Sequence, residues 1–210
     1  MELLDLRKQL KYLYAPSARK IEVVEVPEFR FIMIDGSLKP GEMPGTSPEF
    51  EAAVGALYGV AYTLKFAFKL RKESPVDFPV MALEGLWSAE WGDFDVSRPG
   101  AWSWTLMILL PDVVTPEAFQ EARAQAEKKR PSPALARVRL ERFHEGLCIQ
   151  VMHVGPYATE PQTIQRMRAF ADENGYVNAG RHHEIYLGDP RQAAPEKLRT
   201  VLRQPVRVAG

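Results

Sequence analysis

The 210-residue sequence predicts an α+β fold, an antiparallel sheet with helices packed on one face. Three observations lead to this prediction. Short apolar or alternating runs typical of strands recur along the chain, two segments carry apolar residues at helical spacing, and the succession of strand, helix, strand and strand occurs twice. We therefore expect two similar units related by a pseudo-two-fold axis, with a ligand cleft between the halves.

The elements of the first unit, about residues 18–112, follow a short amphipathic helix in the first dozen residues. Apolar residues at three- and four-residue spacing predict a long helix from Pro48 to about Leu70, with Ser47 as its N-cap. The predicted strands of this unit cover 21–26, 29–35, 80–87 and 102–110.

A polar helix over about 115–130, rich in Ala and Glu, is the predicted connector to the second unit, about residues 135–210. We expect a helix over 161–174 that ends at Asn174-Gly175. The other predicted elements are a hairpin of strands 138–143 and 147–154, a strand 182–187, a short helix 195–202 and an edge strand 206–208. The whole chain, 1–210, is expected to form one domain.

Composition excludes several classes of function. Lys plus Arg and Asp plus Glu each number 27, so the chain lacks the positive charge typical of nucleic-acid-binding proteins. The sequence has no signal peptide or long apolar segment and a single cysteine, so we expect no membrane contact and a cytoplasmic location. Metal-ligand and glycine-rich nucleotide motifs are also missing, and we expect neither metal nor cofactor. The sequence does not indicate an oligomeric state.

The run from His182 to Pro190 contains the strongest candidate for a site residue. Glu184 and Tyr186 are two residues apart in a predicted strand, so their side chains share a face, together with that of His182. A carboxylate beside Ile and Leu is costly unless it is paired or used. Glu184 therefore either lines a pocket, for acid–base chemistry or a cationic ligand, or pairs at the surface with a residue such as Arg181.

Glu84 stands in a similar apolar run one hundred residues earlier, and the duplication predicts that it lines the same cleft as Glu184. The alternative is a solvent-facing Glu84 paired with a cation. Tyr157 follows Gly155-Pro156, and its phenol either reaches the cleft or caps a turn. We expect Trp102 and Trp104 in the core. The remaining candidate ligand-binding residues are Tyr58, Tyr62, Trp87, Trp91, His153 and His182.

Several blocks of the sequence resemble the GyrI-like small-molecule-binding family. This family includes gyrase-inhibitory proteins and the effector-binding domains of multidrug-responsive transcription activators. The resemblance is to its stand-alone branch, without a helix-turn-helix, and spans nearly the whole chain. The blocks that carry it are Phe31–Gly36, Ala61–Phe66, Leu83–Trp87, Met152–Tyr157, His182–Leu187, Asp189–Arg191 and Pro195–Leu198.

The resemblance implies a tandem repeat of strand–helix–strand–strand units, with Glu184 facing a cleft that binds bulky aromatic or cationic compounds. Some stand-alone members hydrolyse electrophilic cyclopropane rings of DNA-alkylating natural products, which is a detoxifying reaction. By this resemblance Glu184 orients or deprotonates the attacking water, and Tyr186 or Tyr157 donates a hydrogen bond to the oxygen that gains charge. The residues that would enclose the planar substrate are Trp87, Trp91, Tyr58 and Tyr62.

Three functions therefore remain open. The first is a small-molecule-binding protein that also hydrolyses cyclopropane-bearing compounds. The second is a module that sequesters or senses drugs without chemistry, and the third is a protein that acts on a protein partner as gyrase inhibitors do. A near-neutral chain makes a DNA mimic a poor explanation of the third function.

Overall fold

The computed structural model describes residues 1–39, 41–89, 102–189 and 192–210. The strands of its large sheet are β2 (Glu22–Val26), β3 (Phe29–Leu38), β5 (Leu83–Ala89), β6 (Trp102–Leu110), β7 (Arg139–Phe143), β8 (Gly146–Val154), β9 (Tyr176–Asn178), β10 (His182–Tyr186) and β11 (Arg199–Val208). Its helices are α1 (Leu6–Gln9), α2 (Lys11–Tyr14), α3 (Pro48–Lys69), α4 (Pro116–Lys129) and α5 (Glu160–Glu173). The predicted α+β class is confirmed.

The strand order of the large sheet is symmetric about its central pair. It runs β2-β8-β11-β10-β5-β6-β3-β7, with β9 added to β11, and all of these pairs are antiparallel. Outward from the β5–β10 pair, each side shows the second, third and first strands of a strand–helix–strand–strand unit, β5-β6-β3 on one side and β10-β11-β8 on the other. Each edge strand, β2 or β7, pairs with the opposite half. This symmetry supports the predicted repeat, whose unit boundaries stay a prediction.

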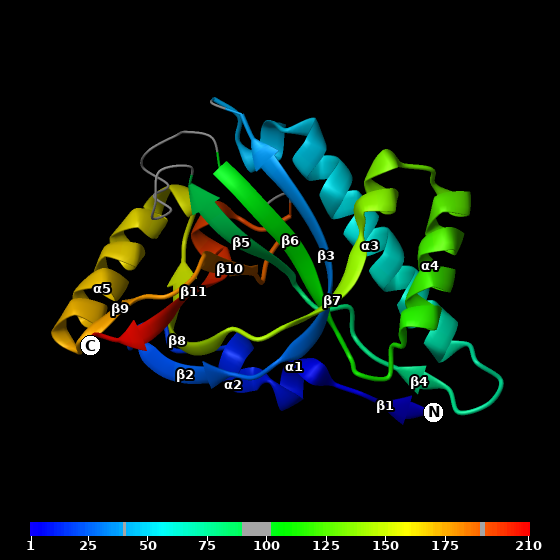
Figure 1. The fold of residues 1–210 in the computed structure, drawn as a ribbon, viewed down its shortest axis with the longest axis horizontal. Helices are drawn as coiled ribbons and strands as arrows, with labels where there is room; N and C mark the ends of the chain where they lie inside the picture. The colour runs from blue at the N-terminus through cyan, green and yellow to red at the C-terminus, as the bar shows by residue number, and fades with distance from the viewer. Residues whose placement is uncertain (40, 90–101, 190–191) are drawn as a thin grey trace.

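Helices α3 and α5 cover the same face of this sheet. Phe50 of α3 stacks on Trp87 of β5, with ring centroids 6.0 Å apart. Met167 of α5 packs in one cluster with Leu202 of β11. Because Trp87 and Leu202 share a face with Glu184 by strand register, both helices flank the position of Glu184. Figure 1 shows α3 with α4 towards one end of the sheet and α5 at the other.

Local chemistry explains where α3 begins and how it is held. The Ser47 side chain accepts a hydrogen bond from the Phe50 amide, and Pro48 occupies the first turn. Glu49 and Glu51 lie in the first turn of the helix and Lys69 in its last turn, which suits the helix dipole. Burial of Phe50, at 7% exposure, against Trp87 contributes about 1.5–3 kcal/mol to docking of the helix on the sheet.

The opposite face of the sheet is covered in part by the N-terminal segment. Here α1 and α2 replace the single helix predicted for the first dozen residues, and α2 buries Leu13 and Tyr14. A separate two-stranded parallel ladder joins β1 (Glu2–Leu3) to β4 (Val76–Asp77). The N-terminal segment is therefore part of the folded unit.

Two further sequence-based assignments of secondary structure were wrong. The strands at 138–143 and 147–154 do not form a hairpin, because β7 pairs with β3 whereas β8 pairs with β2 and β11. The segment 195–202 is not a helix. A single turn of 3₁₀ helix, η4 (Pro195–Lys197), precedes β11, which is a long strand inside the sheet. The polar residues Arg203 and Gln204 and the ladder-breaking Pro205 hid this strand from the sequence pattern.

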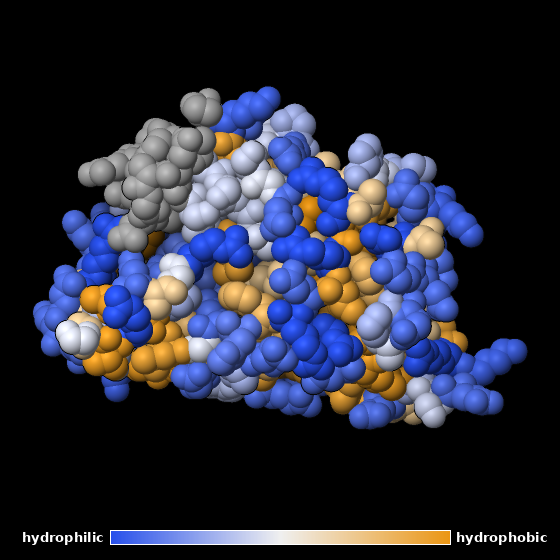
Figure 2. Space-filling view, in the orientation of Figure 1, coloured by the Kyte–Doolittle hydropathy of each residue, from blue (hydrophilic) through white to orange (hydrophobic). Residues whose placement is uncertain are grey.

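The surface seen in Figure 2 is mostly hydrophilic, with hydrophobic side chains gathered in patches. Within the described residues, no helix combines the length and the apolar character that a membrane span requires.

Candidate functional site

Glu184 lies on the helix-bearing face at the centre of the sheet and is 5% exposed. The Tyr186 hydroxyl donates a hydrogen bond to Glu184 Oε2 at 2.7 Å, and the Trp87 Nε1–H group donates to the Tyr186 hydroxyl at 2.9 Å. His182 Nε2 lies 3.5 Å from Glu184 Oε1. Strands β5 and β10 thus hold one carboxylate in a fixed orientation through a chain of aromatic donors.

Gly85 makes this arrangement possible. It pairs directly with Glu184 across the β5–β10 ladder. A Cβ atom at this position would come within 2.8 Å of Trp87 Nε1 and 3.2 Å of the Tyr186 hydroxyl. The missing side chain therefore leaves the space in which the Trp87–Tyr186 hydrogen bond forms.

Tyr157 and His153 border the Glu184 cluster on the side of α5. The Tyr157 ring stands edge-on to the Tyr186 ring, with centroids 6.0 Å apart. Burial and the nearby carboxylates Glu160 and Glu184 raise the pKa of Tyr157 to about 12. His153 Nδ1 lies 2.9 Å from the Thr163 hydroxyl, and burial lowers the pKa of His153. Both side chains are neutral near pH 7 and suit hydrogen bonding.

A hollow of about 210 Å³ opens beside the Glu184 cluster, between α5 and the sheet. Trp87 and His182 form part of its floor, so His182 connects the hollow to the carboxylate. Glu184 itself does not line the wall. The apolar part of the wall consists of Ile149, Ile164, Met167 and Ala171. Its polar part includes Asn178, Gln204 and two cationic residues, Arg168 and Arg181.

Glu84 does not lie in the cleft with Glu184, which corrects the sequence-based placement. Because Glu184 pairs with Gly85, the side chain of Glu84 projects from the face of the sheet opposite to that of Glu184. There it accepts a hydrogen bond from the Tyr14 hydroxyl at 2.5 Å and lies 3.0 Å from His183 Nε2. The two similar apolar runs were aligned one residue out of the structural register, and one residue reverses the face.

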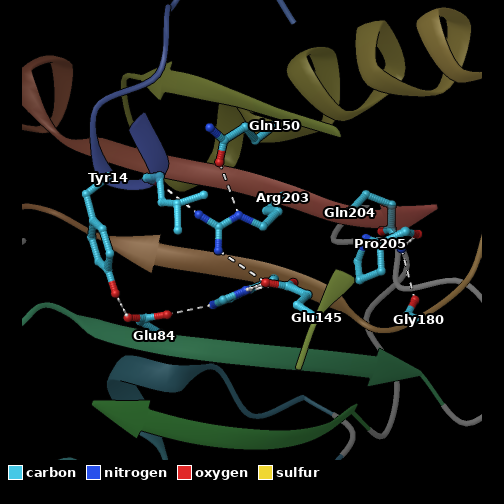
Figure 3. A network of polar contacts seen from close by, with 10 residues as sticks. Tyr14, Glu84, Glu145, Gln150, Gly180, Arg203, Gln204 and Pro205 are labelled. Atoms are coloured by element: carbon cyan, nitrogen blue, oxygen red, sulfur yellow. Dashed lines mark hydrogen bonds and ion pairs between the residues drawn. The ribbon is translucent and has the colours of Figure 1, made fainter. Parts of the chain in front are cut away.

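A buried polar network continues from Glu84 across this second face. His183 Nδ1 lies 2.9 Å from Glu145 Oε1, and Arg203 donates to Glu145 Oε2 at 3.1 Å. Arg203 also donates to Gln150 and to the carbonyl of Leu13. Figure 3 shows Arg203 between Gln150 and Glu145, with Tyr14 reaching Glu84 from the N-terminal segment. The network ties this segment to four strands.

The charges of this network stabilise one another. Burial alone would raise the pKa of Glu145, but the charges and hydrogen bonds of His183 and Arg203 outweigh it and lower the pKa to about 2. Burial alone would lower the pKa of His183, but Glu145 and Glu84 outweigh it and raise the pKa. His183 is the residue next to Glu184, so the network also fixes the strand that carries the candidate catalytic carboxylate.

The other predicted site residues lie elsewhere. Tyr58 and Tyr62 are one turn apart on α3, with ring centroids 6.2 Å apart, and neither lines the hollow. Tyr62 is half-exposed. Trp91 lies outside the described residues. Trp102 and Trp104 are buried in the core, as predicted.

Sequence reasoning missed Glu160, Thr200, His183, Glu145 and Arg203. Glu160 occupies a position in α5 whose spacing from Met167 predicts a core-facing side chain, so its acidic character was a usable signal. The partners of His183 come from distant parts of the chain, so no local sequence pattern predicts them. Within the described residues, no three His, Cys, Asp or Glu side chains converge on a point that suits a metal ion.

A helix-flanked sheet with a hollow beside a buried carboxylate defines a small-molecule-binding α+β domain. Residues 104–207 match the GyrI-like small molecule binding domain. A conserved protein from Listeria innocua is 43% identical, with a TM-score of 0.85 over 97% of this chain and all of that one. The chain belongs to the GyrI-like family.

Two other solved structures extend the comparison. A protein described as a hydrolase from Listeria innocua is 40% identical, with a TM-score of 0.82 over 97% of this chain and all of that one. The C-terminal domain of EcmrR is 9% identical, with a TM-score of 0.55 over 90% of this chain and 98% of that one, and shares the fold. No curated protein sequence matches this chain.

Proposed function

We propose that this protein binds a flat hydrophobic compound in the hollow beside Glu184 and hydrolyses an electrophilic cyclopropane ring held there. One observation carries the proposal: a buried carboxylate is oriented by Tyr186 and Trp87 next to a hollow that has an apolar wall on the side of α5. The similarity to a protein described as a hydrolase supports chemistry in addition to binding.

The hollow suits one part of an aromatic ligand. Its volume of about 210 Å³ is below the roughly 300–1,000 Å³ of typical drug-binding pockets, so a bulky ligand would leave part of its surface outside. Trp87 and Met167 both line the hollow, so a ligand there would meet an aromatic side chain and an adaptable apolar one. This arrangement favours planar compounds of varied outline.

The reaction places Glu184 at the water and Tyr157 at the carbonyl oxygen of the substrate. As the water oxygen bonds to a ring carbon, a water proton moves to Glu184. The strained carbon–carbon bond breaks, and its electron pair passes through the conjugated system to the carbonyl oxygen, which becomes a phenolate. Tyr157 hydrogen-bonds that oxygen, which then takes a proton from solvent, and Glu184 returns its own proton to solvent.

The described contacts support different roles for the two tyrosines. The Tyr186 hydroxyl already donates to Glu184 Oε2 and accepts from Trp87, so we assign it to orienting the carboxylate. Glu184 Oε1, next to His182, is the oxygen assigned to the water. Tyr157 contacts Tyr186 through its ring, and we assign its hydroxyl to the substrate.

The experiment compares turnover and binding in Glu184→Gln and wild-type protein. Formation of the hydrated, ring-opened product of a cyclopropane-bearing alkylator is followed by mass spectrometry, and binding of its ring-opened product by calorimetry. We expect Glu184→Gln to reduce turnover by about 10²–10⁴-fold while binding changes little. The matched control is Glu196→Gln, at an exposed glutamate of η4, with unchanged turnover. Equal turnover in Glu184→Gln and wild type would contradict the proposal.

Binding without chemistry is the second candidate function. A buried carboxylate beside Trp87 also suits a planar cation, which would gain both charge and ring contacts. In this case wild-type protein produces no ring-opened product, and Glu184→Gln weakens binding of a planar cation such as ethidium. Tenfold or greater weakening with no product formation would favour this second function over hydrolysis.

A further inference from the structure

Glu160 breaks the pattern of the helix that carries it. The buried residues of α5 are Glu160, Thr163, Met167 and Ala171, which form one stripe against the sheet. Such a stripe ordinarily consists of apolar side chains. Glu160 is 2% exposed, so a carboxyl group occupies a core position at the end of α5 nearest the Glu184 cluster.

The contacts of α5 place Glu160 on the same face as Glu184. Thr163, one turn further along, contacts His153 of β8. Thr200 of β11 pairs with both His153 and Tyr186 across the ladders, and Tyr186 is hydrogen-bonded to Glu184. Two buried carboxyl groups therefore share one small polar cluster under the start of α5.

The two carboxyl groups differ in their hydrogen-bond donors. Glu184 Oε2 accepts from Tyr186. Glu160 Oε1 is buried without a hydrogen-bond partner among the described residues. A charged oxygen without a donor is costly in the interior, and two neighbouring carboxylates repel each other. These contacts favour Glu160 as the site of a single proton held by this pair.

We propose that Glu160 and Glu184 form a carboxylic acid–carboxylate pair that holds one proton, and that Glu160 is a positioning residue that keeps the negative charge of the pair on Glu184. The proton assignment stands on the contacts described above. Its consequence for catalysis rests on the proposed function of Glu184.

The other groups around the pair are consistent with this assignment. Burial and then the charge of Glu184 raise the pKa of Glu160 to about 9, and the Thr200 hydroxyl opposes this only in part. Tyr157 and Tyr186 also have raised pKa values, so both face the pair as neutral phenols. His153 has a lowered pKa and faces it as a neutral ring, and His182 beside Glu184 lies on the same side of the sheet.

A consequence is that the charge of the cleft changes as the pH rises through the Glu160 pKa of about 9. Loss of the Glu160 proton adds a second negative charge next to Glu184. That charge opposes formation of a phenolate in the cleft, so turnover falls as the pH rises through about 9. A cationic ligand, in contrast, binds more tightly at high pH and releases a proton on binding below pH 9.

The test is carbon NMR of full-length protein labelled at the glutamate side-chain carboxyl carbons. At pH 7 the wild type should show one protonated carboxyl group that titrates near pH 9. Glu160→Gln, which imitates the protonated acid in shape, should lack this signal. Glu184→Gln should move the titration of Glu160 towards lower pH, because the neighbouring charge is gone. The control Glu173→Gln, at an exposed position of α5, should leave the signal unchanged.

Three results overturn the proposal: no protonated carboxyl group at pH 7, the same signal in Glu160→Gln, or an unchanged titration in Glu184→Gln. The measurements on Glu160→Gln and Glu184→Gln are independent, so if one variant folds poorly the other still decides the question. Failure of the proposed function looks different. In that case the NMR titrations follow the expectation, but Glu184→Gln turns over substrate as fast as the wild type.

Discussion

Substitution of Glu145 by Gln tests whether the buried network opposite the cleft holds the sheet together. Glu145 is followed by Gly146, whose φ of 76° favours glycine and turns the chain into β8. The carboxylate pairs with His183 and Arg203, whose side chains are 1% and 3% exposed. Its removal leaves the buried side chains of His183 and Arg203 short of a partner, and loss of one member of a buried ion pair costs about 3–5 kcal/mol.

The pH dependence of stability gives a second estimate of the same magnitude. Glu145 has a pKa of about 2 in the folded protein and 4.5 as an isolated group. At 1.36 kcal/mol per pKa unit, this fall corresponds to ~3 kcal/mol. Since the pKa is lowered on folding, this stabilisation is present above pH 4.5 and is lost as the pH falls towards 2. The raised pKa of His183 acts oppositely, and its contribution is lost as the pH rises above 6.5.

The assay is urea unfolding of the wild type and Glu145→Gln at pH 7 and at pH 3. We expect the variant to be less stable by about 3–5 kcal/mol at pH 7 and by a smaller margin at pH 3. The control is Glu141→Gln, at an exposed residue of β7 paired with Arg139, which should change stability by less than about 1 kcal/mol. A loss below 1 kcal/mol for Glu145→Gln, equal at both pH values, would refute the reasoning.

Two glycine substitutions test different parts of the structure: one should weaken ligand binding, and the other should raise stability. Gly85→Ala brings a methyl group within 2.8 Å of Trp87 Nε1 and displaces the Trp87–Tyr186 hydrogen bond. Binding of a planar ligand, measured by calorimetry, should therefore weaken at least tenfold. Unchanged affinity would argue against the described geometry. Gly55 lies in α3, where an added Cβ meets nothing within 4 Å. Gly55→Ala should therefore raise the free energy of unfolding by about 0.5–1 kcal/mol in a urea titration. A decrease would show that the helix interior is wrongly described.

Local patterns predicted much of the fold. The spacing of apolar residues in 48–69 predicted α3, and the alternation in 182–186 placed Glu184 and Tyr186 on one face. β11 was missed because its polar residue Arg203 is buried against partners that are distant in sequence. The alternation of apolar residues in a strand predicts which apolar side chains are buried, but it does not predict a buried charge with a distant partner.

The candidate site was predictable only where one strand determined it. Glu84 was placed on the wrong face of the sheet because two similar runs define a register only to within one residue. A shift of one residue moves a strand side chain to the other face. Glu160 lies on a different element from Glu184, and their proximity depends on how α5 docks on the sheet. Helix docking is set by packing of distant side chains, which no single segment encodes.

A crystal structure of the Glu184→Gln variant with a planar cyclopropane-bearing compound tests the central claim most directly. The account predicts that the ring system lies in the hollow against Trp87, with the strained carbon facing residue 184 and the carbonyl oxygen near Tyr157. A compound bound outside this hollow, or one whose reactive carbon points away from residue 184, would contradict it.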